Sequence, residues 1–584
     1  MSLNGQWADG ILTGLRDGGV RRFVVCPGSR SAPLALAAWP LLDDADRDAV
    51  VDERSAGFYA LGCALDGTPA AVITTSGTAV ANLLPAVVEA HQADVPLVLV
   101  TADRPPELRD TGANQTIFQP GLFGRFTRWA ADLPCPAPDV LGQARRWGAR
   151  AALAAMGWPP GPVHLNVPLR EPLAPDPEDA GRPRPAASPQ PGADPPAAPT
   201  SPPGPPPRGW DRALRGGRGV VVVGPLRAGR DRVRQAVRKV GLPVLADALS
   251  GLRWTGPADP AGPAMPVTAH DAFLADGDVR ATLRPDWILQ VGGLPTSKHL
   301  QRWICDHADV PRVRIDGTGR RWDGIGTPCT LVVGDAATTL AGIASRDAPA
   351  GDAQDAWGAL WRRLDEAAWT ATADALSTRA GRASEAAAVG AVLDAAPPRV
   401  LVGNSLPVRD VERFGRPGRG PGSLVANRGA SGIDGLVATT AGLGGVGLIG
   451  DMAFRHDIGS LPLLRRRRAR LVVVDNGGGR IFDRLPVVGA PLPEGAYERL
   501  FLAPSTTDLP AACRAAGLRA EACAPDGLRD AISDRPGDGA DVVIVTVDGA
   551  ASTTWRERHL AAVAEAVRPL AAVAAPGSRS FGSR

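Results

Sequence analysis

Lysine is almost absent from this 584-residue sequence, since Lys239 and Lys298 are the only two among its 64 basic residues. Arginine carries the rest of the positive charge, so an arginine by itself does not indicate phosphate recognition. The formal net charge at pH 7 is only +3. A protein that binds nucleic acid mainly through phosphates has a larger basic excess. The composition therefore gives no reason to expect a nucleic-acid partner.

Cysteine and histidine are also scarce, with seven of each. The cysteines form no C-x-x-C pair and the histidines do not cluster, which predicts a reducing compartment and no structural zinc site. No apolar run approaches the roughly 20 residues that cross a bilayer. The N-terminus has no signal-peptide pattern. We therefore expect a cytoplasmic protein without a membrane span.

What the sequence does contain is a regular alternation of short β-branched runs with alanine-rich helical stretches. This rhythm predicts parallel sheets with helices on both faces. The chain is too long for a single core, so we predict an α/β fold of three doubly wound parallel-sheet domains, at residues 1–170, 210–350 and 351–575. Predicted strands include Phe23–Cys26 and Ala49–Asp52.

A proline-rich segment separates the first two predicted domains. Fifteen of the residues from Pro172 to Pro207 are proline, so we predict a semi-extended linker at 171–209. A docking site for a proline-binding partner is the alternative. The small, polar residues 576–584 are predicted to form a flexible tail.

Two strand ends in the last third of the chain carry polar side chains. Val446–Ile449 is followed by Gly450 and Asp451, and Leu471–Val474 is followed by Asp475 and Asn476. Asp451 and Asn476 are 25 positions apart, which leaves room for one helix and a return strand, so both side chains should emerge at the same sheet edge. Carboxylate, amide and carbonyl oxygens suit Mg²⁺. An ordinary strand–helix–strand unit with two turns is the alternative.

Glycines 477–479 follow directly, and they would let the backbone approach a diphosphate closely. The two strand ends and these glycines resemble the cofactor signature of thiamine diphosphate enzymes. Eight further stretches occur in the order found in one family of these enzymes: Cys26–Ser31, Asp52–Gly57, Thr74–Asn82, Thr101–Arg109, Gly112–Gln115, Thr296–Lys298, Gly403–Leu406 and Ala426–Asp434. Together they resemble the 2-succinyl-5-enolpyruvyl-6-hydroxy-3-cyclohexene-1-carboxylate synthases of menaquinone biosynthesis.

The resemblance implies a pyrimidine-binding first domain, a central domain and a diphosphate-binding third domain. It implies a homodimer or tetramer, because the cofactor of this family lies between the first domain of one subunit and the third domain of another. The implied reaction is decarboxylation of 2-oxoglutarate, followed by addition of the resulting succinyl-semialdehyde carbanion equivalent to isochorismate. Glu53 is implied as the catalytic acid that exchanges a proton with the aminopyrimidine ring. Without the resemblance, we would interpret Glu53 as a helix N-terminal residue favoured by the helix dipole.

The family also implies the remaining site residues. Asp451, Asn476 and the carbonyl of Gly478 would bind Mg²⁺ or Mn²⁺. Further positions implied to contact the cofactor are Pro27, Asn82, Ser405, Leu406, Ile433, Asp434, Met452, Gly479 and Ile481. The positions implied to bind substrate are Arg30, Ser31, Arg104, Gln115, Lys298, Arg409, Arg428, Phe482 and Leu485. Arginine is the natural partner of the substrate carboxylates, although in so arginine-rich a chain each could instead form a surface ion pair.

Two departures from the family pattern lie at the charged end of the cofactor. Met452 and Ala453 follow Asp451 where a small hydroxyl residue is usual, and Asp475 stands where an asparagine is usual. Two other functions stay open: another thiamine diphosphate 2-oxo acid decarboxylase or carboligase, and a non-catalytic scaffold with a cofactor fold. The run Arg465–Arg468 is interpreted as a solvated helix end, with an effector site as the alternative.

Overall fold

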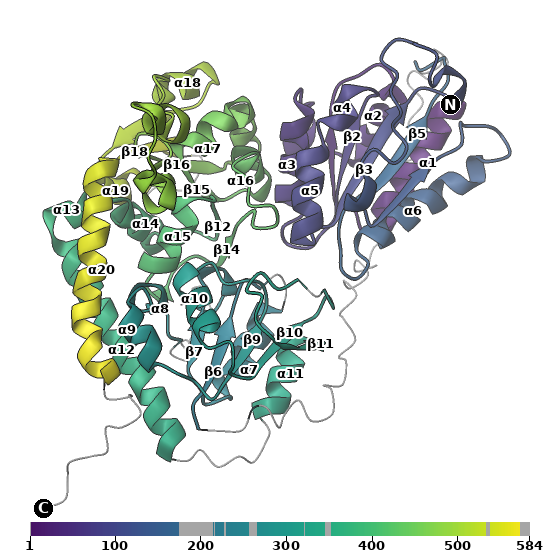
Figure 1. The fold of residues 1–584 in the computed structure, drawn as a ribbon. Helices are drawn as coiled ribbons and strands as arrows, with labels where there is room; N and C mark the ends of the chain where they lie inside the picture. The colour runs from purple at the N-terminus through teal and green to yellow at the C-terminus, as the bar shows by residue number, and fades with distance from the viewer. Residues whose placement is uncertain are drawn as a thin grey trace, which may run out of the picture.

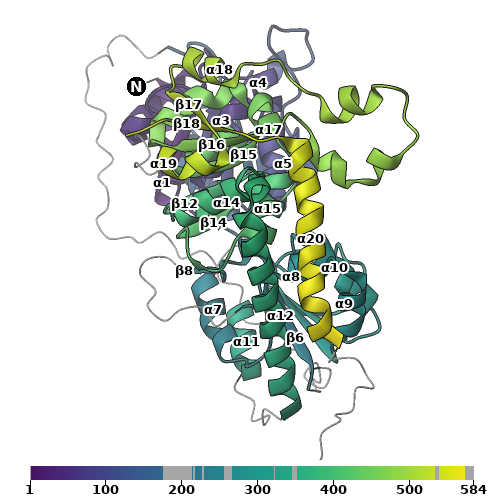
Figure 2. The same ribbon diagram turned by 90° about the vertical axis from the view of Figure 1, so that its left-hand side faces the viewer.

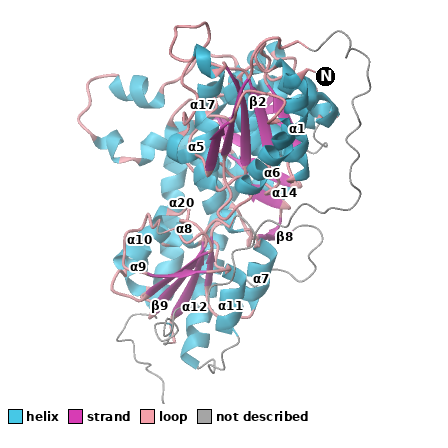
Figure 3. Ribbon diagram, turned by 90° about the vertical axis from the view of Figure 1, so that its right-hand side faces the viewer, coloured by secondary structure: helices cyan, strands magenta, loops and turns pink. Residues whose placement is uncertain are grey.

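The computed structural model describes residues 2–174, 214, 217–226, 229–255, 266–320, 322–344, 352–532 and 538–572. The predicted linker from residue 175 onward and the predicted tail lie outside these residues. Figure 1 shows three separate sheets, each flanked by helices, and Figure 3 shows helices on both faces of the strands. We call the described parts around them the N-terminal unit (2–174), the central unit (217–344) and the C-terminal unit (352–572).

The N-terminal unit has a five-stranded, fully parallel sheet. In sheet order its strands are β1 (Arg22–Val25), β2 (Ala70–Thr74), β3 (Leu97–Asp103), β5 (Val163–Pro168) and β4 (Trp129–Asp132). Its helices are α1 (Leu3–Asp17), α2 (Ala32–Ala38), α3 (Glu53–Cys63), α4 (Thr78–Ala81), α5 (Leu84–Ala93) and α6 (Ala144–Ala155).

The central unit also has a five-stranded parallel sheet. Its strands are β11 (Thr330–Val333), β10 (Arg312–Asp316), β9 (Trp287–Val291), β6 (Gly219–Val223) and β7 (Val244–Ala246). Its helices are α7 (Arg230–Arg238), α8 (His270–Phe273), α9 (Gly277–Thr282), α10 (Lys298–Asp306) and α11 (Ala336–Ala344). A two-stranded ladder of β8 (Trp254–Thr255) and β13 (Gly418–Arg419) joins it to the C-terminal unit.

The C-terminal unit has a six-stranded parallel sheet. Its strands are β14 (Ser423–Val425), β12 (Arg399–Val402), β15 (Val446–Gly450), β16 (Arg470–Asp475), β18 (Val542–Thr546) and β17 (Ala520–Cys523). Its α-helices are α12 (Asp352–Ser377), α13 (Arg379–Arg382), α14 (Glu385–Asp394), α15 (Leu406–Phe414), α16 (Leu436–Leu443), α17 (Asp451–His456), α18 (Leu509–Ala515), α19 (Leu528–Ala531) and α20 (Gly549–Ala572). The parallel α/β class predicted from the sequence is confirmed in all three units.

One predicted strand is wrong. Residues 49–52 form no strand. One backbone hydrogen bond, from the Val50 N–H to the Val25 carbonyl at 2.9 Å, joins this segment to β1. Conversely, the structure adds the edge strands β4 and β17, which the sequence analysis did not identify. Both are partly exposed along their length, so neither has the continuous apolar run that marks a buried parallel strand.

Two long helices of the C-terminal unit also cover the central sheet. Trp357 and Trp361 of α12 pack in one apolar cluster with Val220 of β6 and Val563 of α20. Figure 2 shows α12 and α20 side by side, running down from the C-terminal sheet past the central one. The domain boundary at residue 350 stays a prediction. Among the described residues, no helix is long and apolar enough to span a bilayer.

The N-terminal and C-terminal units share a core through a close crossing of α3 and α16. A Cβ on Gly62 would lie 2.2 Å from the carbonyl oxygen of Thr439, and one on Gly442 would lie 2.0 Å from that of Tyr59. Only glycine permits this backbone approach. The crossing places the start of α3 against η9 (Ile458–Arg467) of the C-terminal unit, where the Ser55 and Ser460 hydroxyls lie 2.7 Å apart.

The arginine run at 465–468 contributes to the same contact. Arg467 Nη2 donates to Asp46 Oδ2 at 2.7 Å and Arg467 Nε donates to the Tyr59 hydroxyl at 3.0 Å, while Arg466 Nη2 donates to the Asp48 carbonyl at 2.7 Å. The interpretation of the run as a solvated helix end is therefore wrong for these two residues. They join the C-terminal unit to the N-terminal unit.

Replacing Arg467 with alanine is expected to lower the free energy of unfolding by about 3 kcal/mol, because it leaves the buried Asp46 carboxylate without its cation. Asp46 is 2% exposed. Urea unfolding followed by circular dichroism measures the change. The exposed neighbour Arg465 is the control, since its replacement by alanine is expected to stay within about 0.5 kcal/mol of wild type. Equal effects of the two replacements would contradict this role for Arg467.

Candidate cofactor and substrate site

The ends of β15 and β16 lie side by side, as predicted. The two strands pair in parallel with Gly450 opposite Val474. Asp451 therefore begins α17 directly beside Asp475 and Asn476, at the carboxyl edge of the sheet. Asp451 is 6% exposed and Asn476 is 7% exposed. Two oxygen-bearing side chains from different strands thus converge at the sheet edge where ligands of open α/β sheets bind.

Asp451 carries a buried charge with little compensation. Burial raises the pKa of its carboxyl to about 6, with Arg455 opposing this shift and Asp475 adding to it. Its cationic neighbour is Arg455, whose Nη2 lies 3.4 Å from Asp451 Oδ2. A divalent cation at this carboxylate would supply the missing positive charge. The following Met452 is half-buried and offers only a thioether, which is a weak hydrogen-bond acceptor.

The side chain of Asn476 is oriented by Glu385. Asn476 Nδ2 donates to Glu385 Oε1 at 3.0 Å. An ionised carboxylate can only accept, so the amide nitrogen must face Glu385 and the amide oxygen is left for another partner. Sequence reasoning missed Glu385, because it lies 91 residues from Asn476 and no motif connects the two.

The glycine loop after β16 is shaped by close backbone contacts. A Cβ on Gly478 would lie 2.1 Å from the Leu502 carbonyl oxygen, and one on Gly479 would lie 2.2 Å from that of Phe501. Gly478 also has a φ of +119°, which side chains rarely permit. Glycine is therefore required at both positions, because the backbone at 501–502 occupies the space that a side chain would take. The donor set and this loop both fit a metal-bound diphosphate.

An aromatic wall follows the loop. Ile481 and Phe482 belong to η10 (Arg480–Arg484), and Leu485 follows it. The Phe482 ring lies 5.3 Å from the Phe501 ring, which belongs to η12 (Glu498–Leu502). Leu485 is 43% exposed. These residues belong to the yellow-green segment that projects from the body in Figure 2.

Two loops beside β15 hold the next group of predicted residues. Asn404 Nδ2 donates to the carbonyls of Asn427 at 2.7 Å and Gly432 at 2.8 Å, which binds the two loops together. Ser405 has a φ of +71°, a strained conformation for a residue with a side chain and one that is concentrated at ligand sites. Leu406 begins α15 and is 7% exposed.

The loop that carries Ile433 is fixed by the N-terminal unit. Glu89 of α5 is 3% exposed and accepts hydrogen bonds from the backbone N–H groups of Gly429 at 2.7 Å and Ala430 at 2.6 Å. Ile433 packs against the core shared by the two units, and Asp434 is half-buried. Glu89 was not identified from the sequence, since a single glutamate on an alanine-rich helix carries no motif.

The predicted catalytic acid stands at the start of α3. Glu53 is its first residue, and Asp52 caps the helix by accepting from the Arg54 N–H at 3.0 Å. Asn82 Nδ2 donates to Glu53 Oε2 at 3.4 Å. Pro27 is exposed just after β1. Within the described chain, no hydrogen bond or ion pair joins Glu53 to the metal-binding candidates.

The four predicted substrate arginines form two neighbouring pairs. In the N-terminal unit, burial and then the charge of Arg104 lower the pKa of Arg30. Arg30 is 3% exposed and donates to the Leu169 carbonyl at 2.8 Å. In the C-terminal unit, burial and then the charge of Arg428 lower the pKa of Arg409. Within the described residues, no carboxylate lies within ion-pair distance of Arg104, Arg409 or Arg428.

Of the other predicted polar substrate residues, Ser31 and Gln115 belong to the N-terminal unit and Lys298 to the central unit. Ser31 donates to the Gly28 carbonyl at 3.1 Å, and Gln115 Nε2 donates to the Ser76 carbonyl at 2.9 Å. Lys298 begins α10 of the central unit and donates to Gln301 Oε1 at 3.0 Å. No contact within the described structure joins Lys298 to Arg409 or Arg428.

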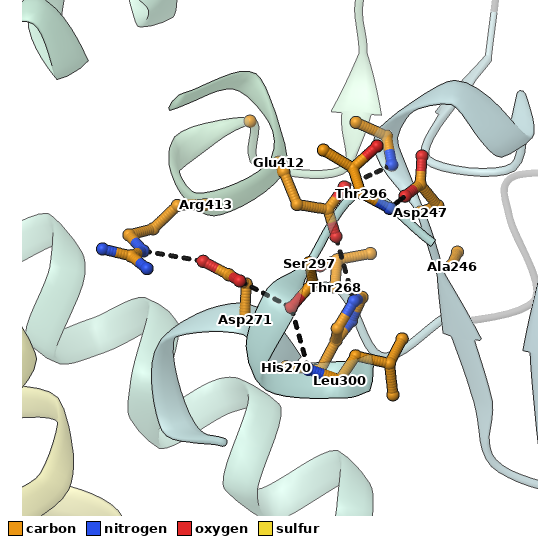
Figure 4. A network of polar contacts seen from close by, with 12 residues as sticks. Ala246, Asp247, Thr268, His270, Asp271, Thr296, Ser297, Leu300, Glu412 and Arg413 are labelled. Atoms are coloured by element: carbon orange, nitrogen blue, oxygen red, sulfur yellow. Dashed lines mark hydrogen bonds and ion pairs between the residues drawn. The ribbon is translucent and has the colours of Figure 1, made fainter. Parts of the chain in front are cut away.

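The helix that carries Arg409 is anchored to the central unit by a buried polar network (Figure 4). Arg413 Nε donates to Asp271 Oδ2 at 2.7 Å, and Glu412 Oε1 lies 3.0 Å from His270 Nε2. Ser297, the N-cap of α10, donates to Asp271 Oδ1 at 2.5 Å. The network therefore links the start of α10, where Lys298 lies, to α15 through Asp271.

Comparison with known proteins gives a consistent result. The family model described as "Thiamine pyrophosphate enzyme, N-terminal TPP binding domain" matches residues 6–122, and the one described as "Middle domain of thiamine pyrophosphate" matches residues 205–393. The 2-succinyl-5-enolpyruvyl-6-hydroxy-3-cyclohexene-1-carboxylate synthase of Halobacterium salinarum is 39% identical over 513 residues, covering 83% of this chain and 85% of its own. The synthases of the same name from Chloroflexus aurantiacus (38%, 86% of each chain) and Myxococcus xanthus (37%, 96% of this chain and 98% of its own) are also similar.

Proposed function

This chain belongs to the 2-succinyl-5-enolpyruvyl-6-hydroxy-3-cyclohexene-1-carboxylate synthase family, and from that membership we propose how its site carries out the reaction. The enzyme uses thiamine diphosphate to decarboxylate 2-oxoglutarate and joins the remaining four-carbon unit to isochorismate, in menaquinone biosynthesis. The single observation that supports this site best is the pairing of β15 with β16, which brings Asp451 and Asn476 to one sheet edge above the glycine loop.

Asp451, the Asn476 amide oxygen and the Gly478 carbonyl would hold Mg²⁺ or Mn²⁺, and the metal with the loop amides would hold the diphosphate. When bound, thiamine diphosphate supplies the electron sink for decarboxylation. The residues of the chain bind the cofactor and orient it. Ile433 and Leu406 supply apolar surface beside the cofactor, while Glu53 exchanges the proton that activates it.

The two arginine pairs are proposed to bind the carboxylates of the two substrates. Each pair places two guanidinium groups close enough to lower the pKa of one member. A carboxylate between them would offset this repulsion and accept several charge-assisted hydrogen bonds. Ser31, Gln115 and Lys298 would add polar contacts, and Phe482 and Leu485 would exclude water from the reacting carbon.

We propose that the complete site forms between two copies of the chain. Glu53 and Asn82 belong to one unit of the chain and the metal-binding residues to another, and among the described residues no hydrogen bond or ion pair joins Glu53 to the metal-binding residues. The partner copy would bring its Glu53 to the glycine loop. We also place the enzyme in the cytoplasm, since all seven cysteines are free thiols.

The decisive experiment incubates the purified enzyme with thiamine diphosphate, Mg²⁺, 2-oxoglutarate and isochorismate. The expected result is release of CO₂ with formation of the adduct, which mass spectrometry identifies. Release of CO₂ with no adduct, together with coupling to a simple aldehyde, would instead support another 2-oxo acid decarboxylase or carboligase. Absence of cofactor binding in calorimetry would support a scaffold protein.

Replacing Arg409 with glutamine is expected to raise the KM of one substrate about 10–100-fold, equivalent to about 1.4–2.8 kcal/mol, because a carboxylate loses a charged donor. Steady-state kinetics with each substrate varied in turn measures the change. The control is Arg363→Gln, at an exposed arginine of α12, which should leave both KM values unchanged. Unchanged KM values in the Arg409 variant would show that this residue does not bind a substrate carboxylate.

A further inference from the structure

Behind the proposed metal ligand Asn476 lies a buried chain of charged side chains with no assigned role. Glu385 is 3% exposed, and Arg556 and Asp410 are 3% and 2% exposed. Glu385 accepts from Asn476 Nδ2 at 3.0 Å and from Arg556 Nη2 at 3.0 Å. The Ser552 hydroxyl also donates to Glu385. Both oxygens of the Glu385 carboxylate therefore accept hydrogen bonds, one from the Asn476 amide and the other from Arg556 and Ser552.

The far end of this chain reaches the helix of a substrate arginine. Arg556 of α20 donates to both oxygens of Asp410, at 2.5 Å and 2.8 Å, and its guanidinium lies 5.4 Å from the centre of the Phe414 ring. Asp410 follows Arg409 directly in α15. Hydrogen bonds to carboxylates on two sides and an aromatic ring over its face fix the position of this guanidinium group. The network therefore holds Glu385 in place from the side opposite Asn476.

We propose that Glu385 is a positioning residue that turns the side-chain oxygen of Asn476 toward the metal ion. This rests on the proposed function, in which Asn476 is a metal ligand. An amide without a partner at its nitrogen could rotate and present –NH₂ to the cation, which would repel it. Partners behind metal ligands typically change metal affinity 10–100-fold when removed. The glutamate side chain is long enough for both contacts, because Oε1 accepts from Asn476 while Oε2 accepts from Arg556.

Two substitutions remove the acceptor that faces Asn476 in different ways. Glu385→Asp keeps the charge beside Arg556 but shortens the side chain by one C–C bond, roughly 1.5 Å, so the stronger ion pair should retain the carboxylate and release Asn476. Glu385→Gln keeps the length, but Arg556 and the Ser552 hydroxyl both donate, so the glutamine oxygen should face them and its –NH₂ should face Asn476, whose own –NH₂ then has no acceptor. A positioning role predicts loss of metal affinity in both variants. A purely structural role predicts a similar loss when Arg556 loses its other carboxylate, Asp410.

The measurement is Mn²⁺ binding to the full chain in the presence of thiamine diphosphate, followed by electron paramagnetic resonance of free Mn²⁺. Glu385→Asp and Glu385→Gln are each expected to weaken Mn²⁺ binding about 10–100-fold. Asp410→Asn is the matched control. It removes a charge beside Arg556, but its amide oxygen can still accept from Arg556 and Glu385 keeps its own contacts, so Mn²⁺ affinity should stay unchanged. Circular dichroism confirms that each variant is folded.

The inference is overturned if either Glu385 variant binds Mn²⁺ as tightly as wild type, or if Asp410→Asn loses as much Mn²⁺ affinity as the Glu385 variants do. Should Glu385→Asp fail to fold, Glu385→Gln and the Asp410 control decide by the same criteria. Asn476→Ala separates the two proposals. If it loses Mn²⁺ while Glu385→Asp does not, only the positioning role fails. If Asn476→Ala and wild type bind Mn²⁺ equally, the metal assignment itself fails.

Discussion

The Glu53→Gln enzyme is expected to turn over about 10²–10⁴-fold more slowly than wild type, the usual contribution of a positioned general acid or base. Glutamine has the shape of glutamate but cannot exchange a proton at neutral pH. Glu53 begins α3 and receives a hydrogen bond from Asn82 at 3.4 Å, so the substitution removes no buried contact. Folding and thiamine diphosphate binding should therefore be retained. Steady-state kinetics and calorimetry on the same preparation measure both quantities.

The control for this experiment is Glu107→Gln. Glu107 is a glutamate of the same unit with a half-exposed side chain, paired with Arg170 at 2.6 Å, and it lies outside the proposed site. Its replacement is expected to leave kcat unchanged. A Glu53→Gln enzyme that binds cofactor and turns over at the wild-type rate would show that another group exchanges the proton.

The second large effect is expected at Asp451. Its replacement by alanine should weaken Mg²⁺-dependent binding of thiamine diphosphate at least about 100-fold, since losing a partner behind a metal ligand already costs 10–100-fold. The buried carboxylate is the only full negative charge among the three proposed metal ligands. Calorimetric titration of thiamine diphosphate with and without Mg²⁺ measures the change. Activity with both substrates should fall in parallel.

The neighbouring Asp475→Asn is the matched control for Asp451. Its charge adds to the raised pKa of Asp451, and its Oδ1 accepts from the Gly477 N–H at 3.3 Å, a contact that asparagine can keep. Removing a negative charge beside the diphosphate should leave cofactor affinity equal to or tighter than wild type. Wild-type affinity in Asp451→Ala, or an equal loss in both variants, would contradict the assignment of Asp451 as the metal ligand.

Errors in the sequence prediction have a common physical origin. The wrong strand at 49–52 has a suitable local composition but only one hydrogen bond to β1, and ladder formation depends on a neighbour that composition does not reveal. The edge strands β4 and β17 were missed because their side chains are partly exposed. Two arginines of the run 465–468 looked solvated because their partners lie more than 400 positions away.

Local sequence patterns are sufficient to predict the parallel α/β class, the family, and the strand ends that bear Asp451 and Asn476, because short-range patterns decide where a buried parallel strand begins and ends. The packed fold is needed to see that Glu385 orients Asn476, that Glu89 holds the loop at 429–430, and that glycines let α3 cross α16. These contacts join side chains or backbones far apart in the chain. Their geometry follows from how whole helices and sheets pack, and a local sequence pattern does not reveal it.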